Sequence, residues 1–125
     1  MQPMTYIDTN VILRYLLDDD PLLSSKAKTR LEALEEMQTG IEVVGECVYV
    51  LAGVYQVPRK EISQILTALF SRDSWKIFRK DAVIGALKLY GTSSIDFVDA
   101  YLVSLHRTTG MEILSFGRKV RQLTR

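Results

Sequence analysis

Four carboxylates in the sequence stand where they could bind a divalent cation. Asp8 separates the apolar segment MTYI from the helix-like NVILRYLL, and Glu46 lies among apolar residues in VVGECVYVL. Asp96 and Asp99 are three residues apart in IDFVDAYL, a spacing that puts both on one face of a helix. None of the four has an obvious lysine or arginine partner nearby in the sequence. Mg²⁺ and Mn²⁺ prefer such oxygen ligands and activate water for attack on phosphoryl groups, so we expect hydrolysis of a phosphodiester bond.

Each acid also has a purely structural explanation. Asp8 could be a helix N-cap, a task that Thr9 or Asn10 could share, and Asp96 and Asp99 could serve only the helix dipole. Glu46 could be an exposed residue of a half-buried helix. Its apolar neighbours nevertheless predict that it is partly buried or faces a cleft, where a carboxylate needs a partner. The aspartates of DDDP are interpreted as loop and cap residues rather than ligands.

Composition excludes several other kinds of site. His106 is the only histidine and Cys47 the only cysteine among 125 residues, so a zinc site built from these types and an internal disulfide are excluded. We expect His106 at a helix end, and Cys47 and Trp75 in the core. The longest apolar run, CVYVLAGVY, is far shorter than the roughly 20 residues that span a bilayer, and no signal-peptide pattern opens the chain. We therefore expect a cytoplasmic protein without a membrane partner.

The candidate acids must be positioned by strands that alternate with helices. Apolar patterns predict strands at 4–7, 75–78 and 111–116, and a mixture of a short extended piece and a helix at 41–55. Helices are expected in the remaining periodic segments: 10–17, from Ser24 or Ser25 onward, 57–70, 81–90, from Ser93 or Ser94 to Gly110, and the basic tail after 117. Gly91 is expected to end the helix at 81–90, and Pro58 to lie in a first turn.

Strands separated by helices pair in parallel and are covered by helices on both faces. The predicted fold class is therefore α/β: a three-layer α/β/α sandwich with a short central parallel sheet, in a single domain over residues 1–125. Ligands of such sheets bind beyond the carboxyl ends of the strands, where Asp8 stands.

Several segments in a fixed order resemble the PIN domain family, with the VapC-type toxins of toxin–antitoxin pairs as the nearest likeness. The segments are YIDTNVILRYLLDDDP, VVGECVYVL, VPRKEI, LKLYGTSSIDFVDAYLVSLH and EILSF. They cover nearly the whole chain, and the ordered set is specific although DTN alone is common. The resemblance implies a PIN-like sandwich and a metal-dependent endoribonuclease that uses Mg²⁺ or Mn²⁺. It further implies an RNA substrate, a homodimer and a cognate antitoxin that neutralises the toxin.

The same resemblance implies roles for individual residues. Asp8 and Asp99 match the acids that bind the metal directly, whereas Glu46 and Asp96 match acids that hold metal-bound waters and prepare the nucleophile. Asn10 and Ser115 match polar residues that steady the site. The remaining candidates are basic residues that could contact RNA: Arg14, Arg118 and Lys119. For the basic tail, a solvated terminal helix favoured by its dipole is the alternative explanation.

The sequence departs from the family at two places. Gly117 stands where the family usually has an aspartate, and the segment between Gly40 and Glu46 is several residues shorter. The first departure supports a second hypothesis, a degenerate PIN module that binds RNA or a partner protein without cleavage. A third hypothesis, a phosphoryl-transfer or receiver-like domain with Asp8 as nucleophile, would favour an aspartate two residues later, where Asn10 stands.

Overall fold

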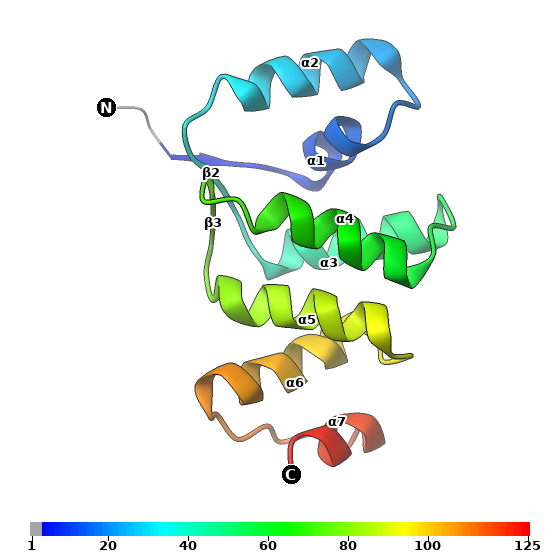
Figure 1. Cartoon of the computed structure of the whole chain (residues 1–125), viewed down its shortest axis with the longest axis vertical. Coiled ribbons are helices and arrows are strands. Elements are labelled where there is room, and N and C mark those ends of the chain that lie inside the picture. Colours follow the sequence, from blue (N-terminus) through cyan, green and yellow to red (C-terminus); the bar gives the residue numbers. More distant parts are fainter. Residues whose placement is uncertain (1–3) are drawn as a thin grey trace. The chain divides into compact units, whose positions relative to one another are not determined.

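Three short strands pair in parallel in the computed structural model, which describes residues 4–125 (Figure 1). They are β1 (Thr5–Tyr6), β2 (Met37–Thr39) and β3 (Trp75–Ile77), and they lie in the order β1-β2-β3. Met37 is opposite Thr5 on one side and Trp75 on the other. The expected parallel sheet is confirmed, with β2 as its central strand.

Helices make up most of the rest of the described chain. They are α1 (Thr9–Leu16), α2 (Pro21–Glu32), α3 (Ile41–Gly53), α4 (Arg59–Phe70), α5 (Lys80–Thr92), α6 (Phe97–Thr109) and α7 (Arg118–Leu123). Within residues 4–125, no helix combines the length and apolar character that crossing a membrane requires.

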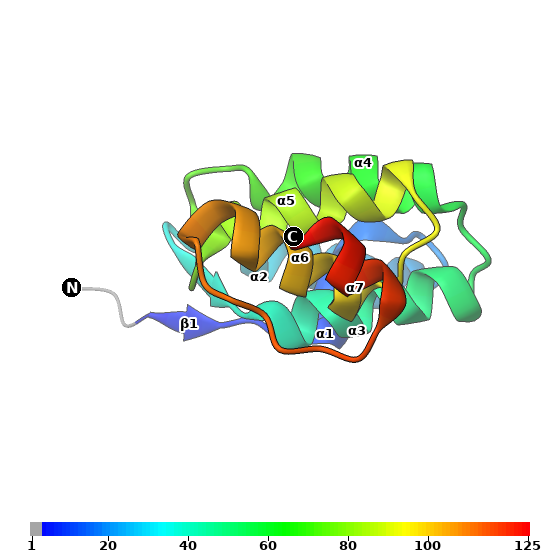
Figure 2. The ribbon, with the colours of Figure 1, turned by 90° about the horizontal axis from the view of Figure 1, so that it is seen from below.

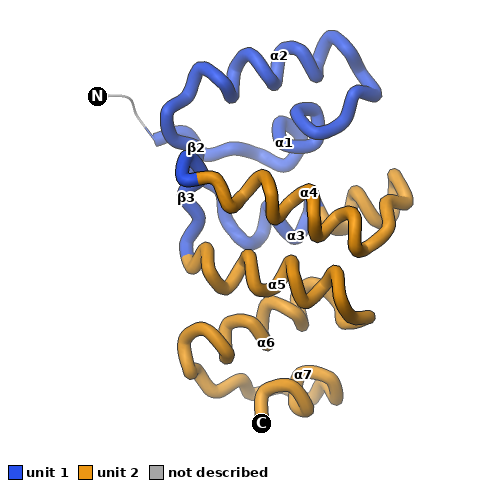
Figure 3. The backbone as a smooth tube through the Cα atoms, in the orientation of Figure 1, with its two compact units in different colours: residues 1–47, 73–78 blue, residues 48–72, 79–125 orange. Residues whose placement is uncertain are grey.

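The chain divides into two compact units (Figure 3). Unit 1 contains residues 1–47 and 73–78, and unit 2 contains residues 48–72 and 79–125. Helix α3 contributes its first part, up to Cys47, to unit 1 and the remainder to unit 2. The single domain over residues 1–125 stays a prediction.

Unit 1 builds its core from the sheet and from the contact between α1 and α2. Trp75 and Ile77 of β3 are buried while the intervening Lys76 is exposed, the alternation of a half-covered strand. Ile12 of α1 and Leu31 of α2 are also buried, on helices that pack against each other. This core holds the end of β1, and with it the start of α1.

Unit 2 is a layer of packed helices in which α5 contacts both α4 and α6. Ile62 and Leu66, one turn apart on α4, are fully buried. A side chain at Gly85 of α5 would collide with the hydroxyl of Ser104 on α6. That hydroxyl donates a 2.6 Å hydrogen bond to the carbonyl of Ala82, so the absence of a side chain at Gly85 permits a close contact between the two helices.

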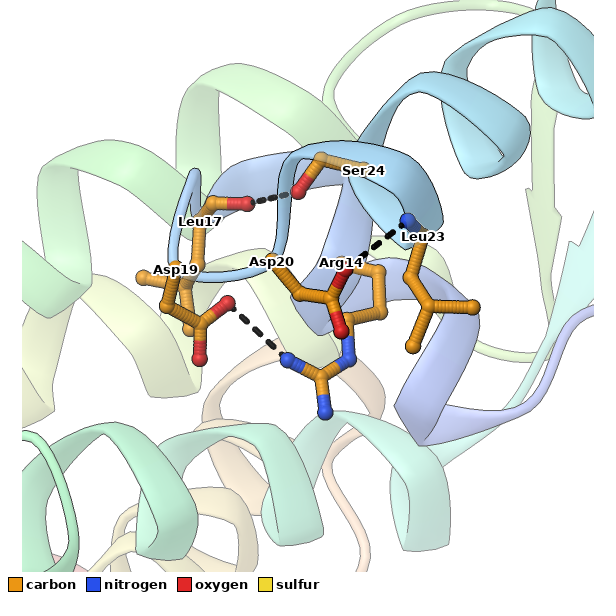
Figure 4. Close-up of polar contacts among 6 residues, drawn as sticks. All are labelled: Arg14, Leu17, Asp19, Asp20, Leu23 and Ser24. Carbon is orange, nitrogen blue, oxygen red and sulfur yellow. Dashed lines mark hydrogen bonds and ion pairs between the residues drawn. The ribbon is translucent and has the colours of Figure 1, made fainter.

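Helix α2 begins earlier than predicted, at Pro21 rather than at Ser24 or Ser25. Asp20 caps it, because its Oδ1 accepts a 3.2 Å hydrogen bond from the backbone N–H of Leu23. The hydroxyl of Ser24 instead donates a 2.5 Å hydrogen bond to the Leu17 carbonyl (Figure 4). Proline suits the first helical position because its missing N–H has no helical acceptor there.

Three other helix limits differ from the prediction. Helix α5 continues past Gly91, and α6 starts after Asp96 rather than after Ser93 or Ser94, because the Ser93 hydroxyl donates a 2.6 Å hydrogen bond back to a carbonyl near the end of α5. Pro58 precedes α4 as its N-cap instead of lying in the first turn. The end of α6 is confirmed at Gly110, whose φ of 77° suits glycine.

The segment 41–55 contains no extended piece, which corrects the prediction. The backbone N–H groups of Val43 and Val44 already bond to the carbonyl of Gly40, so α3 starts directly after this glycine. The second strand lies before Gly40, at Met37–Thr39.

The predicted last strand, 111–116, is also wrong: among the described residues this segment pairs with no strand. Figure 2 shows it as an irregular connection between α6 and α7. Its apolar residues suggested a strand, yet Leu114 is 95% exposed and Phe116 is 93% exposed. The carbonyl of Met111 bonds to Nδ1 of His106 at 2.7 Å instead. His106 lies in the last turn of α6, as predicted.

Candidate functional site

Asp8 lies just beyond the carboxyl end of β1, at the N-cap position of α1. Its backbone is extended (φ −82°, ψ 159°), and its exposed side chain makes no capping hydrogen bond. Asp20 occupies the same position of α2 and does cap its helix. A cap contributes about 1 kcal/mol, so α1 lacks this stabilisation, and the Asp8 carboxylate has no hydrogen-bond partner among residues 4–125.

Two polar residues follow Asp8 in α1. Asn10 is exposed at the start of the helix, and its supporting role stays a prediction. Thr9 is only 2% exposed, and its Oγ1 has no hydrogen-bond partner among the described residues. Buried hydroxyls are normally hydrogen-bonded, so this oxygen is an exception within the described chain. The sequence had suggested Thr9 only as a possible cap.

Glu46 is exposed, so the first of the two expectations, that it is partly buried, is wrong, and the second, that it faces a cleft, stays a prediction. The apolar residues that surround it in the sequence point to the other side of α3, where Val44, Cys47 and Val48 are fully buried. Glu46 belongs to a stripe of exposed residues at helical spacing, with Glu42 one turn before it. The helical spacing of the polar residues in α3, rather than the apolar neighbours, is the sequence signal that predicts an exposed Glu46.

Cys47 shows that Asp8 and Glu46 act on the same part of unit 1. Its thiol is fully buried, as predicted. Burial raises its pKa from the usual 9.0 to about 12, and the negative charges of Glu46 and Asp8 contribute further to the rise. Both carboxylates are therefore close enough to influence one buried group.

Asp96 and Asp99 lie together at the start of α6 in unit 2. Asp96 is the N-cap but, like Asp8, makes no capping hydrogen bond with its side chain. Asp99 is in the first turn and half-buried. Both charges raise the pKa of Tyr49, after burial as the largest cause. The predicted pairing of these two acids at one helix start is confirmed.

Arg59 supports the segment that leads into α6. Its Nε donates hydrogen bonds to the carbonyls of Tyr90 at 3.1 Å and Ser93 at 2.9 Å, and its Nη2 donates to the carbonyl of Ile95. The guanidinium also lies 3.7 Å from the centre of the Tyr90 ring. Arg59 therefore fixes the backbone up to the residue before Asp96. Sequence reasoning missed this role, since its acceptors are backbone groups more than thirty residues away.

Ser115, Gly117 and Lys119 lie around the start of α7. The Ser115 Oγ accepts a 3.0 Å hydrogen bond from the N–H of Gly117, which is the N-cap of α7. Gly117 has an ordinary φ of −68°, and a Cβ there would lie 3.3 Å from the Ser115 Oγ. A side chain is thus possible at this position after a small shift. Lys119 donates a 2.6 Å hydrogen bond to the hydroxyl of Ser94, and Arg118 is exposed.

The aspartates of DDDP have structural roles, as predicted. Asp18 lies 3.5 Å from the ammonium of Lys28, and Asp20 caps α2. Asp19 accepts a 2.9 Å hydrogen bond from the guanidinium of Arg14, one of the predicted RNA contacts (Figure 4).

The four candidate acids are divided equally between the units. Asp8 and Glu46 belong to unit 1, and Asp96 and Asp99 belong to unit 2. Carboxylate oxygens without histidine or cysteine fit Mg²⁺ or Mn²⁺. Within either unit, the residues that the structure describes gather no group of three or more His, Cys, Asp or Glu side chains suited to a metal. Neither unit alone therefore supplies a three-carboxylate site.

Comparison with known proteins supports the expected family. The chain is similar to a VapC ribonuclease of Aquifex aeolicus (strain VF5), with 27% identity over 128 residues that cover 96% of this chain and 92% of the relative. No solved structure gives a significant match. The model of the PIN domain family matches residues 5–125. Together with the short three-stranded parallel sheet and its many helices, this match confirms the expected PIN-like α/β fold. The chain belongs to the PIN domain family.

Proposed function

We propose that this PIN domain protein is a divalent-metal-dependent endoribonuclease, and that it is the toxin of a type II toxin–antitoxin pair in the cytoplasm. The proposal rests above all on the four acids Asp8, Glu46, Asp96 and Asp99. None of their carboxylates makes a hydrogen bond or ion pair with a described residue. Carboxylates without partners are suitable ligands for a hard cation. The name of the relative, VapC ribonuclease, supports the same activity.

Asp8 and Asp99 are the proposed direct ligands of Mg²⁺ or Mn²⁺. When bound, such an ion lowers the pKa of a coordinated water and stabilises negative charge on a phosphoryl group. Glu46 and Asp96 are proposed to accept hydrogen bonds from the attacking water and to take its proton. Asn10 and Ser115 are proposed to orient the carboxylates, and the Ser115 hydroxyl keeps its own proton to donate because its oxygen accepts from Gly117.

The basic candidates suit contacts with RNA phosphates. Arg118 is exposed at the start of α7, and Lys119 is held by Ser94 near the segment that leads to Asp96. Arg14 is paired with Asp19, and a half-exposed pair of this kind contributes at most about 1 kcal/mol. It can therefore exchange Asp19 for a phosphate. A cognate antitoxin and a second copy of the chain are the proposed protein partners.

Gly117 favours an alternative function, a PIN module that binds RNA or a partner protein without cleavage. The glycine leaves the N-cap of α7 without a side chain, where the family usually has a carboxylate. An aspartate at 117 would add the missing acid, and it would also cap α7. A test must separate these two effects.

The test is calorimetric titration of Mn²⁺, together with Mn²⁺-dependent cleavage of fluorescent single-stranded RNA. Native protein is compared with Asp99→Asn, Gly117→Asp and Gly117→Asn. The last variant caps α7 as aspartate does but adds no charge, so it isolates the effect of the carboxylate.

The endoribonuclease proposal expects that the native chain binds Mn²⁺ and cuts RNA, and that Asp99→Asn does neither. If the native chain is inactive while Gly117→Asp gains binding and cleavage and Gly117→Asn does not, the non-cleaving module is the correct function. Equal binding by native protein and Asp99→Asn would show that the proposed ligands are wrong.

A further inference from the structure

A cavity of about 710 Å³ lies in unit 1 among β1, α1 and α2. Its size falls in the range of about 300–1,000 Å³ that is usual for ligand sites. Leucine, valine, isoleucine and alanine side chains make up much of the wall. The lining residues with charged, amide or phenol side chains are Tyr6, Asp8, Asn10, Arg14, Lys26 and Arg30.

Helix α2 presents two cations to this cavity. Lys26 and Arg30 are one turn apart on its lining side, interleaved with apolar residues such as Ala27. Neither has a hydrogen bond or ion pair with a described residue, whereas Lys28, outside the lining, is paired with Asp18. Arg30 gains from the dipole in the last turn, but Lys26 lies mid-helix and gains nothing there. Unpaired cations on the lining side favour an anionic ligand.

Arg14 adds a third cation to the same cavity. Its ion pair with Asp19 is partly solvated, with side-chain exposures of 36% and 35% (Figure 4). Such a pair contributes at most about 1 kcal/mol. The guanidinium can therefore turn to an incoming anion at small cost.

Tyr6 is the aromatic residue among those that line the cavity. The residue is half exposed, and its hydroxyl donates a hydrogen bond to the carboxylate of Glu42. That bond raises the pKa of Tyr6, so the phenol stays neutral, and it holds the ring in place. An aromatic side chain that stacks on a nucleobase contributes about 1–3 kcal/mol per base.

We infer that this cavity binds one nucleotide of the RNA strand adjacent to the cleaved bond. The base stacks on Tyr6 against the apolar wall, and phosphates bind Lys26, Arg30 and Arg14. A nucleotide combines a flat apolar base with an anionic phosphate. The apolar side chains of the cavity suit the base, and its three cations suit the phosphate. The inference rests on the proposed function, because Asp8, a proposed metal ligand, lines the same cavity.

The experiment measures fluorescence anisotropy of a short fluorescein-labelled single-stranded RNA in EDTA, where metal-dependent cleavage is off. Lys26→Ala should raise Kd about three- to tenfold and lower the salt slope by about 1, whereas Lys28→Ala should change Kd by less than about twofold. Tyr6→Leu should raise Kd about tenfold, and Tyr6→Phe, which keeps the ring, should not. Circular dichroism confirms that each variant is folded.

Three outcomes would overturn the inference. Equal weakening by Lys26→Ala and Lys28→Ala would show that overall charge alone matters. Unchanged RNA binding in both Lys26→Ala and Tyr6→Leu would place the nucleotide elsewhere. If the cavity variants Lys26→Ala and Tyr6→Leu bind a labelled acidic peptide more weakly than native protein does, while their RNA binding is unchanged, the cavity is a peptide site.

Cleavage of the same RNA with Mn²⁺ separates this inference from the proposed function. If native protein cuts RNA while the cavity variants bind it normally, only the inference fails. If native protein binds RNA through the cavity but never cuts it, the nuclease proposal fails, and the cavity is a nucleotide site without a cleaved bond beside it.

Discussion

Unit 1 holds one of its two candidate acids, Asp8, in the wall of a cavity, whereas unit 2 supports the segment before its two acids with a network of hydrogen bonds. In unit 1, Asp8 lines the cavity and the neighbouring Thr9 hydroxyl has no described partner. In unit 2, Arg59 binds three carbonyls before Asp96, and Lys119 binds Ser94 in the same segment. These polar groups of unit 2 thus fix the backbone before Asp96, whereas the Asp8 carboxylate of unit 1 makes no capping hydrogen bond. Substitutions in unit 1 should therefore affect activity more than stability, and those in the unit 2 network the reverse.

The largest expected effect is that of Asp8→Asn on RNA cleavage. We expect the initial rate with Mn²⁺ to fall about 10²–10³-fold, as for loss of one charge-stabilising group. The free energy of unfolding should change by less than about 0.5 kcal/mol, because the side chain neither caps α1 nor pairs with a described residue. Cleavage assays and urea unfolding provide the two measurements.

Asp20→Asn is the matched control, since Asp20 takes the same position of a helix in the same unit but caps it. Asparagine caps as well as aspartate, so both rate and stability should be kept. An equal loss of rate in the two variants would contradict a special role for Asp8.

The second largest effect is that of Arg59→Ala on stability. The substitution removes the hydrogen bonds that Arg59 donates to three backbone carbonyls, and it removes the contact with the Tyr90 ring. We expect urea unfolding to show a loss of about 2–3 kcal/mol. Arg59→Lys keeps the charge but not the planar fork and should recover only part of the loss. A loss below about 0.5 kcal/mol in Arg59→Ala would show that the network does not stabilise unit 2.

Much of the fold could be predicted from local patterns. The C-terminal end of α6 and the buried β3 follow from Gly110 and from the alternation around Trp75. The segment 111–116 could not be predicted, because an apolar segment makes a strand only where another strand pairs with it. The start of α2 was misplaced because Asp20 and Ser24 are both good caps, and the hydroxyl of Ser24 bonds to Leu17 instead.

The candidate acids could be selected from the sequence, but their surroundings could not. Asp8 and Asp96 both lie at helix starts, as the junctions around them suggested. The exposure of Glu46 depends on which face of α3 is buried, and neighbours in the sequence misled the prediction. The supporting role of Arg59 was missed because its acceptors are backbone carbonyls, which every residue type has. The cavity depends on the contact of α1 with α2, which no motif records.

The third prediction concerns Cys47 in unit 1, and its expected effect is smaller than the two before it. Burial and then the charges of Glu46 and Asp8 raise its pKa to about 12, while in the unfolded chain the thiol has its usual 9.0. The unfolded state therefore ionises first as pH rises. The contribution of the neutral thiol to stability is complete below pH 9 and is lost between pH 9 and 12, by up to about 1.4 kcal/mol per pH unit.

The measurement is urea unfolding at pH 8 and pH 10 in a reducing buffer, for native protein and Cys47→Ala. Other groups titrate in both proteins, so the difference between the two isolates Cys47. The native protein should lose more stability than Cys47→Ala over this interval. Identical losses would show that the thiol is not protected in unit 1.

The smallest expected effect concerns Tyr49, which reports on the acids of unit 2. Burial raises its pKa most, followed by the charges of Asp96 and Asp99. Removal of one negative charge favours the phenolate, so Asp99→Asn should lower the pKa of Tyr49. NMR titration of ¹³C-labelled tyrosine can follow it, with Tyr49→Phe to assign the signal. Asp81→Asn is the control, because Asp81 is in unit 2 but is not among the groups that raise this pKa. If Asp99→Asn leaves the pKa of Tyr49 unchanged, the charge of Asp99 does not act on Tyr49. The electrostatic potential at the start of α6 is then less negative than two neighbouring carboxylates would produce.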